Sequence, residues 1–293
     1  MSHAIIIPIY CENRNTINLC NQLQNFGAEH IVVVNDGLNP KSEYFNELTS
    51  IGCHLVHLKN NNGKGASLKA GIKYAHDNLY NITGYITCDA DGQHTANDVM
   101  KISRMLDLRN GSLILGKRDY KKSKMPINIR IGNRLSSAYF KVITGKSCKD
   151  TQTGLRGIPA FLYDTVMKTK GSRFDFEMNF LTKCADMRVP FYFVNIIADC
   201  SNCSSNFRLI KDTYLIYRTP LRFATASIGC TIIDLVLFTI FAYILPSHMF
   251  FNIMLATLMA RVVSGGINFL INRKVIFGNT DNGAKQALRF FIL

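Results

Sequence analysis

The chain has 293 residues, of which 47% are hydrophobic, and it carries a formal net charge of +14. A chain this basic and this apolar fits a nucleic-acid binder, a membrane-surface protein or a protein that handles phosphorylated ligands. The sequence contains no basic-aromatic repeat typical of RNA- or DNA-binding domains, so we expect no nucleic-acid partner. The N-terminal MSHAIIIPIY predicts no signal peptide. The nine scattered cysteines, with one CxxC at Cys200 and Cys203, predict free thiols rather than a zinc site.

Strand-like and helix-like segments alternate along the first two hundred residues. Short apolar runs predict the strands, and apolar residues at helical spacing predict the helices. In chain order the predicted elements are a strand at 4–9, a helix at 13–26, a strand at 30–36, a short helix near 44–48, a strand at 53–58, a helix at 66–78, a strand at 84–89, a helix at 97–108 and a strand at 111–116. This alternation predicts an α/β fold, a mainly parallel sheet with helices on both faces.

Polar residues follow the predicted strands at their carboxyl ends. Ligands of such sheets bind beyond that edge. The residues concerned are Tyr10, Glu12, Asp36, Lys64 by way of its loop, Asp89, Asp91, Lys117 and Arg118. A purely structural domain would not need polar residues at every strand end, so we expect a binding site there.

The segment ITCDADGQH contains two aspartates one residue apart at the end of a predicted strand. Because side chains alternate along a strand, Asp89, Asp91 and Gln93 should point the same way. Carboxylate and amide oxygens suit Mg²⁺ or Mn²⁺ bound together with substrate phosphates. His94 either joins this set or caps the turn. The alternative is an ordinary strand-to-loop turn, in which Asp and Gly are common.

Three further features are compatible with an anionic ligand. The glycine-rich turn NNNGKG around Lys64 precedes a helix and would present backbone N–H groups to an anion, although a plain loop with a solvated lysine explains it equally well. Asp36 could accept hydrogen bonds from a base or ribose, or simply belong to an Asn-Asp-Gly turn. Guanidinium groups suit phosphates, and Arg118, Arg130 and Arg134 surround a predicted helix.

Residues 224–245 and 249–271 are almost continuously apolar. Each segment is long enough to cross a bilayer as a helix, and the short connector predicts a hairpin. Basic residues flank the hairpin at both ends, so both ends and the large domain should be cytoplasmic. Asp234 and Arg261 lie near the middle of the two predicted helices. Charges inside a membrane are usually paired, so we predict an ion pair between them.

The assembled motifs resemble those of family 2 glycosyltransferases with the GT-A fold, and most closely the polyprenyl-phosphate sugar synthases typified by dolichyl-phosphate mannose synthase. The matching segments, in the family's order, are IIIPIYCENRN, VVVNDG, NNGKGASLKAGI, TCDADGQH, LGKR, DTQTGLRGIP and FDFEMNFL. The tail is similar to the GtrA-like membrane domain in PLRFATASIGCTIIDLVLF, INFLINRKVIFG and ALRFFIL. Departures from the family pattern are Cys11, Asn35, Leu38 and Lys117.

The resemblance implies a role for each matched residue. The donor nucleotide sugar, a GDP- or UDP-sugar, would be bound by Pro8, Tyr10, Glu12, Val34, Asp36, Lys64, Asp89 and Ala90. The Mg²⁺ or Mn²⁺ ion would be bound by Asp89, Asp91 and Gln93, and the lipid phosphate by Arg118, Arg130, Arg134, Ser205 and Arg208. Asp91 and Arg118 would be the catalytic residues.

These features predict three segments: a GT-A domain at 1–210, a juxtamembrane linker at 211–221 and an incomplete GtrA-like domain at 222–293, with two full helices and the start of a third. The expected activity is inverting sugar transfer to a polyprenyl phosphate, dolichyl or undecaprenyl, by a multi-pass protein of the bacterial inner membrane or its equivalent. Its catalytic domain would face the cytoplasm, and a homo-oligomer is left open. One alternative is a hydroxyl-directed transferase of surface polysaccharide or lipopolysaccharide synthesis, with Asp175 or Glu177 as base. The other is a non-catalytic partner in lipid-linked sugar binding or translocation.

Overall fold

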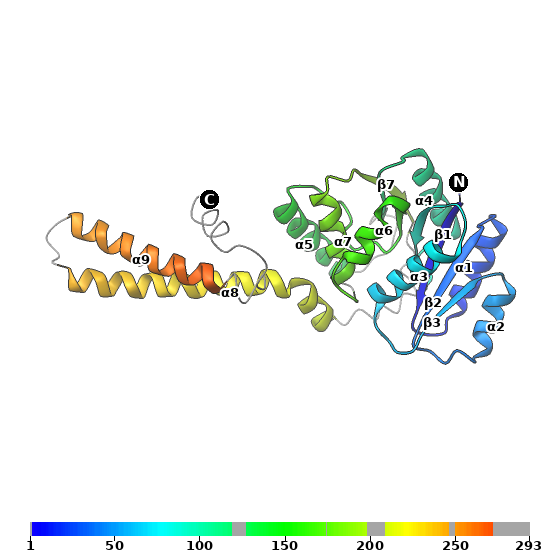
Figure 1. Ribbon diagram of the computed structural model, residues 1–293, viewed down its shortest axis with the longest axis horizontal. Coiled ribbons are helices and arrows are strands. Elements are labelled where there is room, and N and C mark those ends of the chain that lie inside the picture. Colours follow the sequence, from blue (N-terminus) through cyan, green and yellow to red (C-terminus); the bar gives the residue numbers. More distant parts are fainter. Residues whose placement is uncertain (1, 119–126, 174, 198–208, 246–249, 272–293) are drawn as a thin grey trace. The chain divides into compact units, whose positions relative to one another are not determined.

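The computed structural model describes residues 2–118, 127–173, 175–197, 209–245 and 250–271, and the chain divides into two compact units, Met1–Asp212 and Thr213–Leu293 (Figure 1). The CxxC motif and the predicted start of a third membrane helix lie outside the described residues, as do Ser205 and Arg208.

The first unit is built on a seven-stranded sheet with the strand order β3-β2-β1-β4-β6-β5-β7. Its strands are β1 (Ser2–Ile9), β2 (His30–Asp36), β3 (His54–Leu58), β4 (Ile82–Thr87), β5 (Leu113–Arg118), β6 (Arg156–Pro159) and β7 (Phe191–Ile196). Strands β1 to β4 pair in parallel, as do β5 and β7. The short β6 runs antiparallel between β4 and β5. The predicted mainly parallel sheet is confirmed, and β6 and β7 are additions to the five predicted strands.

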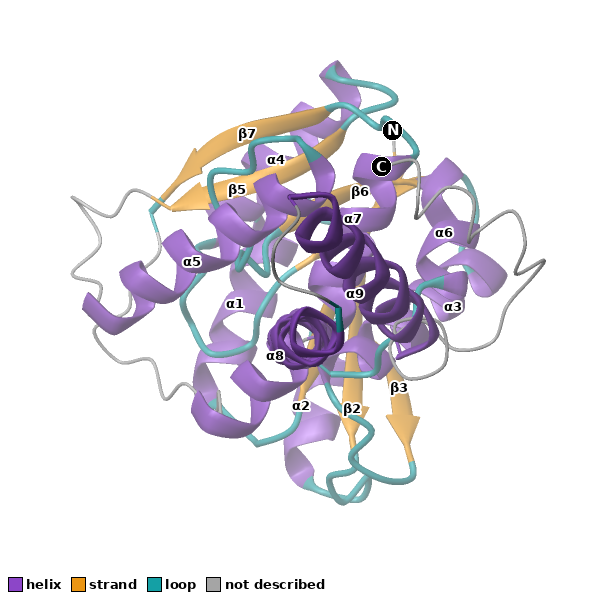
Figure 2. Cartoon of the chain, turned by 90° about the vertical axis from the view of Figure 1, so that its left-hand side faces the viewer, coloured by secondary structure: helices purple, strands orange, loops and turns teal. Residues whose placement is uncertain are grey.

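Helices cover both faces of this sheet; in Figure 2, α1 and α2 lie on one side of β2 and β3, and α3 lies on the other. The helices are α1 (Arg14–Asn25), α2 (Glu43–Ser50), α3 (Lys64–Asn78), α4 (Ala96–Leu108), α5 (Ile127–Thr144), α6 (Tyr163–Lys168) and α7 (Asp175–Asp186), with a 3₁₀ turn at Ala160–Leu162. Asn13, Ser42 and Thr95 begin α1, α2 and α4 by accepting a hydrogen bond from the first turn.

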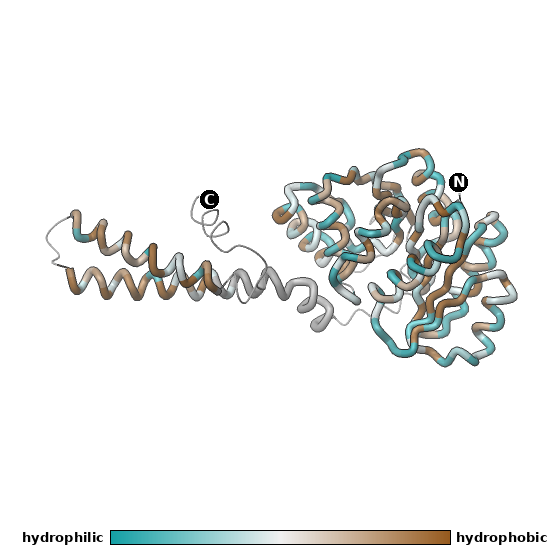
Figure 3. Tube along the Cα trace, viewed as in Figure 1, coloured by the Kyte–Doolittle hydropathy of each residue, from teal (hydrophilic) through white to brown (hydrophobic). Residues whose placement is uncertain are grey.

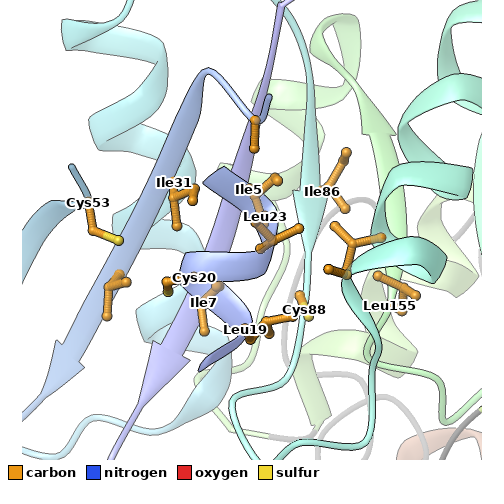
Figure 4. Packing of buried hydrophobic residues seen from close by; sticks show 14 of the residues in the cluster. Ile5, Ile7, Leu19, Cys20, Leu23, Ile31, Cys53, Ile86, Cys88 and Leu155 are labelled. Atoms are coloured by element: carbon orange, nitrogen blue, oxygen red, sulfur yellow. The ribbon is translucent and has the colours of Figure 1, made fainter. Parts of the chain in front are cut away.

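Two hydrophobic cores fill the space between the sheet and its helices. Side chains alternate between the faces of a strand, so neighbouring residues of β1 enter different cores. Ile5 and Ile7 pack with α1, α2 and α4 (Figure 4), whereas Ala4 and Ile6 pack with α3, α6 and α7. Each fully buried isoleucine contributes about 1.5–3 kcal/mol to stability, so the register of β1 is strongly fixed. The carboxyl ends of the parallel strands are thereby held at one edge.

The second unit contains α9 (Phe250–Ile271) and all but the first four residues of α8 (Leu209–Ile244). Both helices include apolar stretches long enough to cross a membrane, Ser227–Ile244 and Phe251–Leu270 (Figure 3). Few side chains in these stretches are buried, unlike those of a core helix in a soluble protein. The predicted linker at 211–221 is helical, because α8 begins before it and continues through it.

The predicted ion pair between the two apolar helices is confirmed. Arg261 Nε lies 3.4 Å from Asp234 Oδ2, and Ser264 Oγ donates a hydrogen bond to Asp234 Oδ1 at 2.7 Å. Ala256, Ala260 and Ser264 are buried and spaced four residues apart, so small side chains let the helices approach closely. Polar contacts and small residues together explain how two largely apolar helices recognise each other in lipid.

Candidate active site

Four charged side chains gather beside the carboxyl end of β4. Lys64 begins α3, Asp89 follows β4, Arg156 begins β6 and Glu177 lies in α7. We call these residues the charge cluster. All four have little exposure to solvent, although they come from segments far apart in the sequence. Burying charges is costly unless they are paired, so their mutual contacts decide what the site can do.

Lys64 joins the two carboxylates of the charge cluster. Its Nζ lies 2.6 Å from Asp89 Oδ1 and 3.1 Å from Glu177 Oε1. Burial alone would lower the pKa of Lys64, but the two carboxylates outweigh burial and raise it. Burial would raise the pKa of Asp89, but Lys64 and His94 outweigh burial and lower it. Lys64 and Asp89 are therefore both charged and form a buried ion pair.

Asp91 is in a different electrostatic situation from Asp89. Its Oδ1 accepts a hydrogen bond from Gln93 N at 3.0 Å, and its Oδ2 accepts one from Gln93 Nε2. Burial and the nearby Asp89 carboxylate raise the pKa of Asp91. Within the described part of the chain, no Lys or Arg side chain pairs with it. Its carboxylate therefore favours an added cation.

The argument from strand alternation for the orientation of Asp89, Asp91 and Gln93 is wrong. Strand β4 ends at Thr87, and the aspartates lie in the following turn. Strand alternation therefore does not orient them. Instead, the start of α1 holds the turn: Thr16 Oγ1 donates to the carbonyl of Ala90 at 3.0 Å, and Asn15 Nδ2 donates to that of Asp91 at 3.5 Å. Gly92 completes the turn with φ +87°, a value that favours glycine.

The donor set fits Mg²⁺ or Mn²⁺ only in combination with a substrate. Across the described residues, no three His, Cys, Asp or Glu side chains are grouped so that they could hold a metal ion. Mg²⁺ commonly uses one or two protein carboxylates and completes its shell with substrate phosphates and water. Asp91 and the side-chain oxygen of Gln93 fit such a partial site. Asp89, the third predicted ligand, is turned to Lys64 instead.

Gly154 forms the wall behind the Asp89 carboxylate. A Cβ atom built on Gly154 would overlap Oδ2 of the Asp89 carboxylate. We expect Gly154→Ala to displace Asp89 and to lower any activity that depends on this carboxylate by about 10-fold to 100-fold, because small misplacements in an active site are costly. Kinetics of membrane preparations would measure the loss. Gly132→Ala in α5 is the matched control, since its nearest neighbours lie at 3.8 and 4.0 Å. Unchanged activity of Gly154→Ala would contradict the assignment.

Asp36 ties the glycine-rich turn to the end of β2. Its two carboxylate oxygens accept hydrogen bonds from the backbone N–H groups of Asn62 at 2.8 Å and Gly63 at 2.9 Å. Helix α3 has no side-chain cap, and Gly63 adopts φ +93°. The turn around Lys64 is therefore built into the site, not a plain solvated loop. A contact of Asp36 with a ligand stays a prediction.

The other predicted nucleotide-binding residues divide by exposure. Pro8 and Val34 are buried neighbours on β1 and β2, where Val34 packs in the core beneath α3. Tyr10 and Glu12 are exposed in the segment after β1. The structure thus gives Val34 a packing role, whereas Tyr10 and Glu12 remain accessible to a ligand.

Arg118 is held by a buried carboxylate. Its Nε and Nη2 donate to Asp150 Oδ2 at 2.7 Å and Oδ1 at 2.8 Å, and its backbone N–H donates to the same group. Asp150 is fully buried. These contacts give Arg118 a structural partner that the sequence did not indicate. Arg130 and Arg134 are exposed on α5. The phosphate-binding roles of the three arginines stay predictions.

Arg156 is the residue of the charge cluster that the sequence analysis did not assign to a site. Its guanidinium donates to the backbone carbonyls of Thr151, Thr153 and Glu177, and so joins the loop before β6 to α7. The motif DTQTGLRGIP contained this residue, directly before Gly157 and two positions after Gly154. Its partners could not be read from spacing alone.

Comparisons with known proteins show the family of this chain. The model of glycosyl transferase family 2 matches residues 4–164, and the GtrA/DPMS transmembrane domain matches residues 222–293. Uncharacterized protein MJ1222 of Methanocaldococcus jannaschii is 32% identical over 188 residues, covering 60% of this chain and 73% of its own length. The UDP-N-acetylglucosamine–dolichyl-phosphate N-acetylglucosaminyltransferase of Methanococcus voltae is 29% identical over 172 residues, covering 52% of this chain and 67% of its own length.

A solved structure is similar in fold. Glucosyl-3-phosphoglycerate synthase from Mycobacterium tuberculosis, in complex with Mn²⁺, UDP-glucose and glycerol 3-phosphate, matches with a TM-score of 0.55 and 12% identity. The match covers 75% of this chain and 78% of that one. The resemblance drawn from the sequence motifs is thus confirmed: the chain belongs to glycosyl transferase family 2 and carries a C-terminal GtrA/DPMS transmembrane domain.

Proposed function

We propose that this protein transfers a sugar from a nucleotide-sugar donor to a polyprenyl phosphate at the cytoplasmic face of a membrane, with inversion at the anomeric carbon. The observation that carries the proposal is the combination, in one chain, of the acidic site at Asp89 and Asp91 with a GtrA/DPMS transmembrane domain. The Methanococcus voltae relative, named for transfer from a UDP-sugar to dolichyl phosphate, supports a UDP-sugar as the donor and a polyprenyl phosphate as the acceptor.

On the donor side, Asp91 and Gln93 would hold Mg²⁺ or Mn²⁺ against the diphosphate. The bound ion supplies electrostatic stabilisation of the charge that gathers on the leaving diphosphate. Lys64 lies beside Asp89 and adds a positive charge at the same edge of the sheet. The turn fixed by Asp36 presents the uncapped start of α3, where backbone N–H groups favour an anion. Asp91 would thus act by positioning charge, not by moving a proton.

On the acceptor side, a phosphate needs positioning more than a base. A polyprenyl phosphate is already an anion at neutral pH, so its oxygen can attack the anomeric carbon directly. A single in-line displacement inverts the configuration. Arg130 and Arg134, exposed on α5, would bind the phosphate. Arg118, which is held by Asp150, would keep this part of the site in place. Its guanidinium could also contact the phosphate.

An exposed apolar stripe on α5 supports delivery of a lipid acceptor. Ile131, Leu135 and Val142 are 52%, 60% and 84% exposed and fall at helical spacing on one face. The basic residues Arg130 and Arg134 flank this stripe. A helix with an apolar face beside basic residues is typical of segments that lie in a membrane interface. We infer that this face of α5 contacts the bilayer surface.

The two alternatives have less support. A transferase that uses a hydroxyl acceptor requires a base, and both candidates are already engaged. Glu177 faces Lys64, and Asp175 Oδ1 accepts a hydrogen bond from Arg173 N at 3.0 Å. A non-catalytic partner would have no need for the buried ion pair of Lys64 with Asp89 beside an Asp91 that pairs with no Lys or Arg among the described residues.

A donor and acceptor screen tests the proposal. Purified protein with Mg²⁺ or Mn²⁺ and a short polyprenyl phosphate would be incubated with UDP- and GDP-sugars, and the released nucleoside diphosphate measured. We expect release that depends on both the lipid phosphate and the metal. Release only with a sugar-hydroxyl acceptor would favour the hydroxyl-directed alternative, and binding without release would favour the non-catalytic one.

A further inference from the structure

The Asp89 carboxylate is already neutralised by a side chain of the protein itself. Lys64 Nζ lies 2.6 Å from its Oδ1, and His94 Nε2 lies 3.5 Å from its Oδ2. Gly154 closes off the space behind it. Both oxygens that a metal would use are thus faced by groups of the chain, whereas Asp91, two residues away, has no such cationic partner among the described side chains.

We propose that Lys64 is an internal counter-ion that competes with the divalent cation for Asp89 while the donor is absent, and that a bound nucleoside diphosphate draws the ammonium group away. This inference rests on the proposed function. Two cations cannot both lie close to one carboxylate without repelling each other. The diphosphate offers Lys64 a new anionic partner, and Asp89 then becomes available to the metal. Metal and nucleotide would therefore each strengthen the binding of the other.

Glu177 is what makes such an exchange feasible. It lies 3.1 Å from Lys64 Nζ, so the ammonium keeps one carboxylate partner after leaving the other. Arg156 holds Glu177 in place: its Nη1 donates to the Glu177 carbonyl at 2.9 Å, and its Nη2 lies 4.0 Å from Oε1. If Asp89 were the only partner of Lys64, the ammonium group would become an unpaired buried charge once it left Asp89. An unpaired buried charge is costly.

The inference is tested by measuring Mn²⁺ binding to the full-length protein in detergent. Electron paramagnetic resonance reports the binding, with and without UDP. For the wild type we expect UDP to tighten Mn²⁺ binding on the order of tenfold. Lys64→Met should bind Mn²⁺ alone about tenfold more tightly than wild type and lose most of the effect of UDP. Lys64→Arg retains the charge and should resemble wild type. Lys69→Met, from the same helix, is the control and should leave Mn²⁺ affinity unchanged.

Glu177→Gln should change the affinity for Mn²⁺ in the opposite direction to Lys64→Met. This variant still tests the inference if Lys64→Met does not fold. Without Glu177, Lys64 depends on Asp89 alone, so Mn²⁺ alone should bind more weakly than to wild type. The inference is overturned if UDP binds to the wild type but Lys64→Met binds Mn²⁺ no more tightly, or if Glu177→Gln binds it more tightly. Failure of UDP to bind any of these proteins would instead overturn a UDP-sugar as the donor in the proposed function.

Discussion

Replacing Asp91 by asparagine is expected to lower the rate of sugar transfer on the order of 100-fold or more. Asparagine has nearly the same shape and retains an oxygen that can accept the Gln93 backbone hydrogen bond. It lacks the negative charge that favours a divalent cation, and the leaving diphosphate would lose stabilisation where its charge develops. The measurement is the release of nucleoside diphosphate by membranes containing equal amounts of each protein, over a range of Mn²⁺ concentrations.

Asp186→Asn is the matched control for this prediction, because Asp186 is an exposed aspartate at the end of α7. Its transfer rate should equal that of wild type. Circular dichroism spectra should be the same for all three proteins, since neither substitution changes a core contact. Near-normal turnover by Asp91→Asn at any Mn²⁺ concentration would sink the assignment of Asp91 to the metal site.

Asp150→Ala should destabilise the first unit by about 3–5 kcal/mol. The substitution leaves the buried guanidinium of Arg118 without the carboxylate that receives two of its hydrogen bonds. It also removes the acceptor for the backbone N–H groups of Arg118 and Gln152. The loss would be measured by urea denaturation of the detergent-solubilised protein, followed by circular dichroism.

The exposed pair of Asp164 and Lys168 provides the comparison for that loss. Their side chains are 76% and 72% exposed and lie 3.9 Å apart. Exposed ion pairs contribute about 0–1 kcal/mol, so Asp164→Ala should change stability little. A free energy of unfolding for Asp150→Ala within 1 kcal/mol of wild type would show that Arg118 finds another partner, and would leave its phosphate-binding role as the better explanation.

The elements of the catalytic unit were largely predictable because its strands are short apolar runs and its helices have one apolar face. The strands β6 and β7 and the helices α6 and α7 were not predicted, and for β6 the reason is physical. Its four residues, Arg156–Pro159, show no alternation, and its antiparallel position between β4 and β5 depends on long-range pairing that no local pattern encodes.

The contacts of the site were less predictable than its residues. The motifs identified Asp89, Asp91 and Lys64, but the pairing of Lys64 with Asp89 and Glu177 depends on how α3, β4 and α7 meet in space. The ion pair of Asp234 with Arg261 was predictable from the sequence. A short connector makes two helices antiparallel, so residues at similar distances from the connector face each other. Prediction therefore succeeded where local connectivity restricts the geometry.

The hydrogen bonds from Asn62 and Gly63 to Asp36 have a consequence for affinity. Fixing the backbone of one residue costs about 1–2 kcal/mol of conformational entropy. Because Asp36 already orders the turn, that entropy is lost when the chain folds and not when a ligand arrives. An unanchored turn would lower the affinity for every ligand that ordered it. A ligand that binds at this turn would meet a backbone whose shape is already set, and its binding energy would not be spent on ordering the turn.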